Sequence, residues 1–270
     1  MHILTNLVLL KYEKINNEIY DSPGDIWWQA NSALYLLKTS VNPCRLGYFK
    51  KILNSHNITP TGKSVLDIGC GGGILSEELC KMGFETTGID PSEQSLAVAI
   101  HHAKSQNLNI KYDKGFGEKL PYTDNSFDYV VCCDVLEHVS DLPKVISEIS
   151  KVLKPKGIFF YDTINRTLFS KLSTIKIAQD WKYFALMPPN LHVWKLFIKP
   201  KELIALLEQN QFIHQHQQGT SPDINPIKLL YYLRKRVKGQ LTYAKLGEKF
   251  KLVESKNMGA LYMGYATKNF

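Results

Sequence analysis

A glycine-rich stretch, SVLDIGCGGG at residues 64–73, constrains the fold of this chain more than any other part of its sequence. A short apolar run is followed by four glycines within five positions, and then by apolar residues at helical spacing. Glycine lacks a Cβ, so it adopts positive φ at little cost and lets a ligand approach the backbone closely. The stretch therefore predicts a buried strand that runs through a tight turn into a helix.

Two acidic residues indicate which ligand this turn binds. Asp90 ends the next apolar run, 21 residues after Gly69, which is close to the spacing at which a carboxylate accepts hydrogen bonds from ribose hydroxyls. Asp67 stands two residues before the first glycine, where it would repel a pyrophosphate but attract the ammonium and sulfonium of S-adenosylmethionine (SAM). The stretch resembles motif I of class I SAM-dependent methyltransferases. A glycine turn that serves packing alone is the alternative interpretation.

The predicted cofactor site extends beyond these two acids. Because the glycines of the turn let a ligand touch the backbone, we place Gly71 and Gly73 in the site with Gly69. Gly117 and Glu118 fall near the end of a later predicted strand, where an adenine could sit.

The rest of the chain alternates between helical and strand periodicity, which is typical of a parallel sheet. We predict an α/β, Rossmann-like fold of the class I SAM-methyltransferase type, with about seven mainly parallel strands and helices on both faces. The chain has 270 residues and 44% hydrophobic content, enough for one enzyme-sized domain with additional segments. We assign residues 1–63 to an N-terminal helical lid and substrate segment, and residues 64–270 to the methyltransferase domain, with insertions at 165–194 and 222–240.

Charge and cysteine content narrow the partners and the compartment. The formal net charge of +8 suggests an acidic partner, either nucleic acid or an anionic membrane. No target-base motif of the Asn-Pro-Pro-Tyr kind is present, so we expect no nucleic acid. The five cysteines form no CxxC pair, which favours a reducing, cytoplasmic location. The apolar run at residues 3–10 lacks a basic start and a cleavage site, so we do not predict a signal peptide.

Three stretches carry aromatic residues in unusual settings. Trp27 and Trp28 are adjacent and cannot share one helix face, so we expect at least one to meet a ligand, a lid contact or the main domain; ordinary packing is the alternative. Residues 165–194 and 224–238 set basic side chains beside aromatic and aliphatic ones. This composition predicts peripheral contact with the inner face of a membrane, although a charge run is more often a solvated surface.

The most specific chemical pattern is CDVLEHV, residues 133–139. If the segment is helical, Asp134, Glu137 and His138 share one face at the carboxyl end of the sheet. Carboxylates with one imidazole suit a divalent cation such as magnesium, manganese or zinc. The alternative is that Glu137 and His138 only shape the cofactor pocket. His192, in the predicted lid, is the candidate base because imidazole titrates near neutral pH; a plain surface histidine is the alternative.

Motifs spread over nearly the whole chain together resemble one family, the O-methyltransferases of ubiquinone biosynthesis. These enzymes methylate hydroxyl groups of polyprenylated phenols and catechols. The glycine stretch and the LEH triplet are shared by many methyltransferases, whereas the NPxRLGY and HxxKxFIKP patterns are more specific. The motifs are, in chain order, VNPCRLGY, VLDIGCGGGIL, TGID, CDVLEHV, KPKG, TINR and LHVWKLFIKP.

The resemblance implies roles for particular residues. Arg45 and Cys133, together with Gly69 and Asp90, would bind SAM, although the local pattern alone favours a solvated surface charge for Arg45. The resemblance also implies that the acids of CDVLEHV and its histidine form the divalent-metal site, with Asp134 standing where relatives carry glutamate. The implied reaction is in-line methyl transfer from a sulfonium to a phenolic oxygen, with His138 and His192 as catalytic residues. A methyltransferase for another small acceptor, or a non-catalytic SAM-binding protein, remains an alternative.

Overall fold

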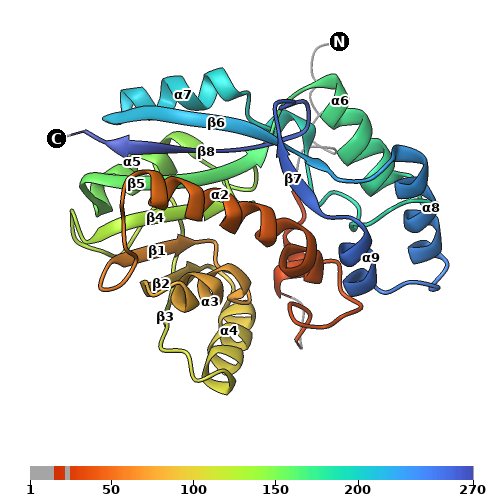
Figure 1. Ribbon diagram of the computed structural model, residues 1–270, viewed down its shortest axis with the longest axis horizontal. Helices are drawn as coiled ribbons and strands as arrows, with labels where there is room; N and C mark the ends of the chain where they lie inside the picture. The colour runs from red at the N-terminus through yellow and green to blue at the C-terminus, as the bar shows by residue number, and fades with distance from the viewer. Residues whose placement is uncertain (1–14, 22–24, 270) are drawn as a thin grey trace, which may run out of the picture.

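The computed structural model describes residues 15–21 and 25–269. The apolar run at residues 3–10, for which we predicted no signal peptide, lies outside these ranges. Within them the chain forms one eight-stranded sheet in the order β3-β2-β1-β4-β5-β8-β6-β7 (Figure 1). The first five strands are parallel, and β8 runs antiparallel between β5 and β6. The strands are β1 (Ser64–Ile68), β2 (Glu85–Asp90), β3 (Lys111–Lys114), β4 (Phe127–Cys133), β5 (Leu153–Ile164), β6 (Phe212–Pro222), β7 (Leu252–Ser255) and β8 (Leu261–Lys268).

The sheet has eight strands where the sequence predicted about seven. The additional strand, β7, is four residues long and pairs antiparallel with β6 at the edge of the sheet. Its sequence, LVES, does not alternate between apolar and polar residues, and two neighbouring residues, Val253 and Glu254, are both exposed. Without that alternation a short edge strand is indistinguishable from a loop in the sequence.

Helices cover both faces of the sheet, and alternation along the strands divides the core into two layers. On β4, Val130 packs toward α5 and α7, whereas Val131 packs toward α2 and α3. Phe49 of α2 lies 4.4 Å from Phe160 of β5, measured between ring centroids, so α2 belongs to the core of the main domain. The helices are α2 (Asn42–Ser55), α3 (Ile74–Lys81), α4 (Glu93–Ser105), α5 (Leu142–Val152), α6 (Leu168–Ser170), α7 (Pro200–Gln209), α8 (Pro226–Val237) and α9 (Tyr243–Lys249).

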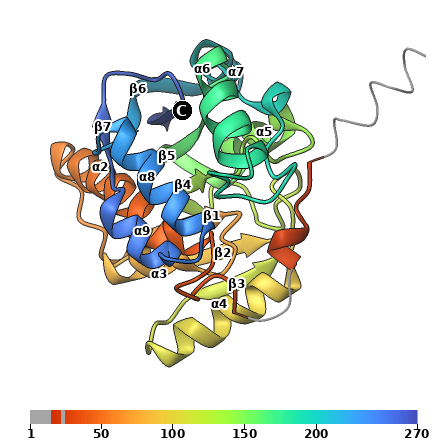
Figure 2. The same ribbon diagram turned by 90° about the vertical axis from the view of Figure 1, so that its right-hand side faces the viewer.

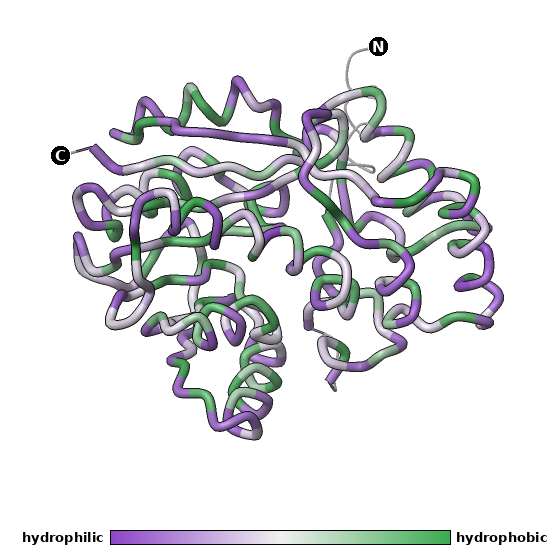
Figure 3. Tube along the Cα trace, in the orientation of Figure 1, coloured by the Kyte–Doolittle hydropathy of each residue, from purple (hydrophilic) through white to green (hydrophobic). Residues whose placement is uncertain are grey.

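The two predicted insertions both lie beyond the carboxyl ends of the parallel strands (Figures 1 and 2). The first contains α6 and a wide helical stretch, Lys171–Asp180, and the second contains α8, with α9 following just after it. Arg234 of α8 stacks on Tyr183 at 4.8 Å, so the insertions contact each other. Hydrophobic and hydrophilic residues are mixed along both (Figure 3). Among the described residues, no helix has the length and apolar content needed to cross a bilayer.

Candidate active site

The glycine turn connects β1 to α3 as predicted, and three of its glycines need their freedom. Gly69, Gly71 and Gly73 have φ of 71°, 50° and 81°. A Cβ on Gly71 would also lie 2.2 Å from the ring of Trp27, so a larger residue is excluded by contact as well as by conformation. The amide of Gly69 donates to the carbonyl of Ile89 at 2.8 Å, which ties the turn to the end of β2.

Both predicted cofactor acids lie at this turn. Asp90 accepts hydrogen bonds from the amides of Gly71 and Ser92, each at 2.9 Å, one on each carboxylate oxygen. Each oxygen keeps a further acceptor position, which is what binding a ribose diol requires. Asp67 accepts a hydrogen bond from the Ser76 hydroxyl at 2.6 Å, and burial raises the pKa of Asp67 to about 7. Asp90 is thus a fixed hydrogen-bond acceptor, and Asp67 beside it is an acid that favours a cationic neighbour. This combination fits SAM.

Arg45 is buried, so its interpretation as a solvated surface charge is wrong. Only 3% of the residue is exposed. Its Nε lies 2.5 Å from Asp162, its Nη2 lies 2.5 Å from Asp134, and its Nη1 donates to Asn42 at 2.6 Å. The acids come from the ends of β4 and β5, more than eighty residues away in sequence, so no local pattern around Arg45 could reveal them. Binding of a cofactor carboxylate by Arg45 remains a prediction.

The segment after β4 is a turn, so the predicted helical face is wrong. Asp134 has a left-handed φ of 55°, and the following turn is closed by a hydrogen bond from the His138 amide to the Val135 carbonyl at 2.8 Å. Helical spacing cannot align residues across a left-handed position. Asp134 instead pairs with Arg45.

Glu137 and His138 are joined by His192 in one cluster. One ligand atom from each of the three side chains lies within 4.8 Å of the others. The two imidazole rings lie 5.0 Å apart, and Thr163 donates to Glu137 at 2.8 Å. Within the described chain, Glu137 Oε1 and His192 Nδ1 are buried without a hydrogen-bond partner. Two unpaired buried atoms among a carboxylate and two imidazoles fit a divalent cation, with His192 in place of Asp134.

Burial favours the neutral form of all three side chains of the cluster. Burial, reinforced by Asp134, raises the pKa of Glu137 to about 8. Burial lowers the pKa of His138 to about 4. Burial, with His138 as the next cause, lowers the pKa of His192 to about 3. Both imidazoles are therefore neutral near pH 7, and a neutral imidazole keeps one nitrogen lone pair.

The remaining predicted residues lie around the same end of the sheet. Cys133 is buried at the end of β4, next to Asp134. Glu118 accepts hydrogen bonds from the amide and hydroxyl of Ser140, at 3.0 and 2.8 Å. A Cβ on Gly117 would lie 3.4 Å from Ile68, the last residue of β1. Their contribution to cofactor binding remains a prediction.

Sequence reasoning missed Tyr20. Its ring stacks on Trp27 with centroids 5.8 Å apart and meets the His138 ring edge-on at 6.0 Å. Tyr20 thus lies between the glycine turn and the histidine cluster. The signal that could have indicated it is a third aromatic side chain shortly before the Trp27–Trp28 pair.

Comparison with known proteins gives consistent results. Residues 66–161 match a family model described as a methyltransferase domain. A ubiquinone biosynthesis O-methyltransferase of Coxiella burnetii is 41% identical, over 77% of this chain and 88% of the relative. Proteins of the same name from Pelagibacter ubique and Rickettsia bellii are 35% and 31% identical, over 83% and 86% of this chain and 91% and 96% of the relatives.

Solved structures share the fold. A Pyrococcus horikoshii protein superimposes with a TM-score of 0.59 at 21% identity, over 94% of this chain and 100% of that one. A SAM-dependent methyltransferase from Aquifex aeolicus gives 0.53 at 17% identity, over 81% and 88%. The predicted Rossmann-like fold class is confirmed.

Proposed function

This chain belongs to the ubiquinone biosynthesis O-methyltransferase family, and we propose that it transfers the methyl group of SAM to a phenolic hydroxyl of a prenylated quinone precursor. It is a SAM-dependent O-methyltransferase. The observation that carries the proposed acceptor chemistry is the cluster of Glu137, His138 and His192. Glu137 and His138 follow β4, and β4 neighbours β1, which leads into the glycine turn, so the cluster lies at the same carboxyl end of the sheet.

The chemistry asks mainly for positioning and for removal of one proton. When bound, SAM supplies a methyl group on a sulfonium, whose positive charge already activates the leaving group. The chain must then hold the phenolic oxygen in line with the methyl–sulfur bond and deprotonate it. Asp90 and the glycine turn orient one reactant, and the cluster receives the hydroxyl of the other.

His192 is proposed to accept the phenolic proton. Its imidazole is neutral, because burial depresses its pKa, and Nδ1 has no hydrogen-bond partner among the described residues. Glu137, held by Thr163, fixes the other side of the cluster. A divalent ion bound by Glu137, His138 and His192 would supply Lewis-acid polarisation of the phenolic oxygen. His192 would then be a ligand of that ion rather than the base.

The proposed acceptor also gives the exposed insertions a role. A polyprenyl tail gains about 0.8 kcal/mol per buried CH₂ in a bilayer, so the enzyme must reach its substrate at the membrane surface. Leu168, Phe169 and Ile227 are 79%, 58% and 78% exposed beyond the carboxyl end of the sheet. Exposed lysines accompany them. We assign this surface, formed by α6, residues 171–187 and α8, to peripheral membrane docking.

The direct test is an assay with methyl-labelled SAM. A prenylated phenol in detergent should become labelled faster than the same head group without its tail. His192→Gln should lower kcat by roughly 10²–10⁴-fold with SAM affinity unchanged, the range expected for loss of a general base. His101→Gln, at an exposed position of α4, is the matched control. Wild-type kcat in His192→Gln would remove the proposed base.

Chelation distinguishes the two proposed roles of the cluster, a metal site and the site of a histidine base. If a divalent ion polarises the phenol, exhaustive chelation should abolish turnover, and added magnesium, manganese or zinc should restore it. Glu137→Gln should then raise the metal concentration needed for half-maximal activity. Full activity after chelation would exclude the metal and leave His192 as the base.

A further inference from the structure

The N-terminal arm, defined as residues 15–21 and 25–28, bridges the two halves of the active site. On the acceptor side, the Asn16 amide donates to the Asn190 carbonyl at 2.8 Å. Asn17 Oδ1 lies 3.3 Å from His138 Nδ1. The arm therefore contacts both the first insertion and the histidine cluster.

On the cofactor side, the arm is bonded to the first turn of α4, immediately after Asp90. The Tyr20 carbonyl accepts hydrogen bonds from the hydroxyls of Ser92 and Ser95, at 3.0 and 2.6 Å. Ser95 Oγ also accepts a hydrogen bond from the Trp27 indole at 2.9 Å. With the Trp27 ring packed on the glycine turn, these contacts fix the backbone of Tyr20 beside the predicted ribose site.

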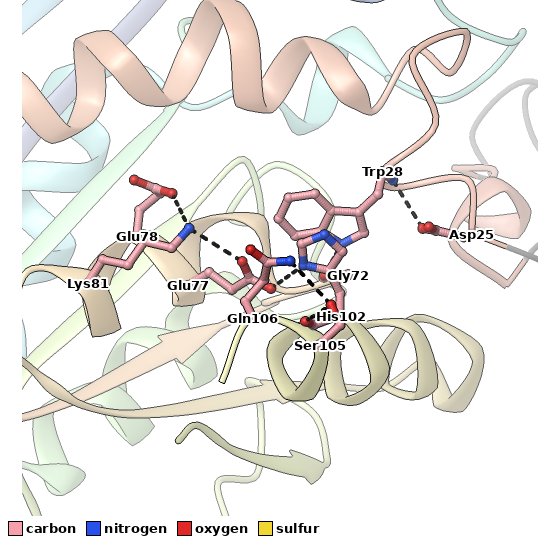
Figure 4. Close-up of polar contacts among 9 residues, drawn as sticks. All are labelled: Asp25, Trp28, Gly72, Glu77, Glu78, Lys81, His102, Ser105 and Gln106. Carbon is pink, nitrogen blue, oxygen red and sulfur yellow. Dashed lines mark hydrogen bonds and ion pairs between the residues drawn. The ribbon is translucent and has the colours of Figure 1, made fainter. Parts of the chain in front are cut away.

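Trp28 attaches the arm to the glycine turn and to α4 (Figure 4). Its indole donates to the Gly72 carbonyl at 2.9 Å and stacks on His102 with centroids 3.4 Å apart and planes 4° apart. His102 Nδ1 in turn lies 2.5 Å from Glu77, a fully buried carboxylate that also faces Lys81 at 3.5 Å. These contacts attach the arm to both the glycine turn and α4.

The ring of Tyr20 lies between Trp27 on the glycine turn and His138 of the cluster. Burial raises the pKa of Tyr20, and the acidic side chains of Asp134, Glu137 and Asp90 raise it further, so acidic groups lie near its ring. Aromatic faces attract cations, and a desolvated site strengthens that attraction.

We propose that Tyr20 forms the wall that binds the methylsulfonium of SAM, with its aromatic ring distinguishing the charged cofactor from the neutral thioether product. This inference rests on the SAM-dependent transfer described above. This role of Tyr20 explains why the N-terminal arm, with its aromatic side chains, is anchored across the glycine turn and Asp90. Loss of charge at sulfur after transfer weakens the contact and so favours product release.

The test compares binding of SAM and of its demethylated product, S-adenosylhomocysteine, by calorimetry. Tyr20→Leu removes the ring, and we expect the affinity for SAM relative to the product to fall by roughly 2- to 30-fold. Tyr20→Phe keeps the ring and should preserve the wild-type ratio. Tyr35→Leu removes a tyrosine of the same N-terminal region that stacks on none of these groups, and it should change neither affinity.

Three results would overturn the proposal. An equal change in both affinities for Tyr20→Leu would make the ring a packing residue. Tighter SAM binding by that variant would mean that Tyr20 occupies the cofactor's own space. A ratio in Tyr20→Phe as low as in Tyr20→Leu would assign the effect to the hydroxyl. If wild-type protein binds no SAM, the cofactor assignment fails, and that outcome is distinct from the other three.

Discussion

Asp90 carries the sharpest prediction for a single residue. Its carboxylate is held by the amides of Gly71 and Ser92, so it is oriented before a ribose arrives. Asp90→Ala should weaken SAM binding by about 1.5–3 kcal/mol, the cost of losing hydrogen bonds to a charged group. Asp128→Ala is the matched control, because Asp128 lies near the amino end of β4 and contacts Lys154. Calorimetry that finds unchanged affinity in folded Asp90→Ala protein contradicts the assignment.

Asp67 should make the stability of the cofactor-free protein depend on pH. Burial raises its pKa from 3.8 to about 7, so between these values the folded protein binds more protons than the unfolded chain. The stability that Asp67 contributes is fully present below about pH 3.8 and is lost as the pH rises through about 7. Asp67→Asn should therefore be more stable than wild type at pH 8 by on the order of 1–3 kcal/mol.

Denaturant unfolding at pH 5 and pH 8 measures this difference. The stability of the wild type should fall between the two values more than that of Asp67→Asn. Parallel pH profiles for the two proteins would show that the Asp67 carboxylate ionises normally in the folded state.

Single residues were predictable where sequence spacing alone fixes the position. Asp90 and the glycines follow from strand–turn–helix geometry, and they lie together as expected. Asp134 and His192 could not be placed in the same way. A left-handed φ at Asp134 breaks the helical spacing there, and Asp134 pairs with Arg45, while His192 arrives from a segment more than fifty residues further along the chain.

At the scale of elements, the N-terminus of α4 serves two purposes. Ser92 caps the helix by accepting a hydrogen bond from the Ser95 amide at 3.1 Å, and it also donates to the Tyr20 carbonyl. Ser92→Ala should reduce stability by about 1 kcal/mol, as for other lost caps, and should also weaken SAM binding because the arm loosens. Asp141→Ala removes the cap of α5 without touching the arm. Thermal unfolding and calorimetry on both variants should show similar destabilisation but a binding defect only in Ser92→Ala.

Elements were predictable when their own periodicity carried the signal. The buried strands β1 and β4 and the capped helix α4 read clearly from the sequence. The edge strand β7 and the turn after β4 could not be predicted in this way. Hydrogen bonds to β6 define β7, and a single left-handed residue, Asp134, defines the turn. Both depend on tertiary contacts that override local propensity.

At the scale of the whole molecule, three distant segments meet at the carboxyl ends of the parallel strands. The arm brings the Tyr20 ring, the strand ends bring the acids, and the first insertion brings His192. Parallel topology predicts that strand ends gather at one edge, so the location of the site was predictable. The crossing of the arm over that edge was not, because it depends on contacts with Ser92, Ser95 and Gly72.

The same edge of the molecule should bind anionic membranes. Arg234 and Arg236 are only half-exposed and stack on Tyr183 and Tyr243, whereas the docking surface also carries exposed lysines. Each lysine near an anionic surface adds roughly 1 kcal/mol of binding energy, which salt screens. Co-sedimentation with anionic vesicles at low salt should fall strongly when three exposed lysines of this surface are changed to glutamine. These are Lys171, Lys182 and Lys228, and the control triple is Lys50, Lys63 and Lys104.

Neutral vesicles and high salt test the electrostatic part of this binding separately. Wild-type protein should bind neutral vesicles weakly through Leu168, Phe169 and Ile227 alone, and high salt should bring its binding to anionic vesicles down toward that level. The control triple should behave as wild type, since it removes the same charge from other faces. If wild-type protein stays in the supernatant with anionic vesicles at low salt, the docking surface is refuted. The acceptor would then have to be a phenol that reaches the histidine cluster through water.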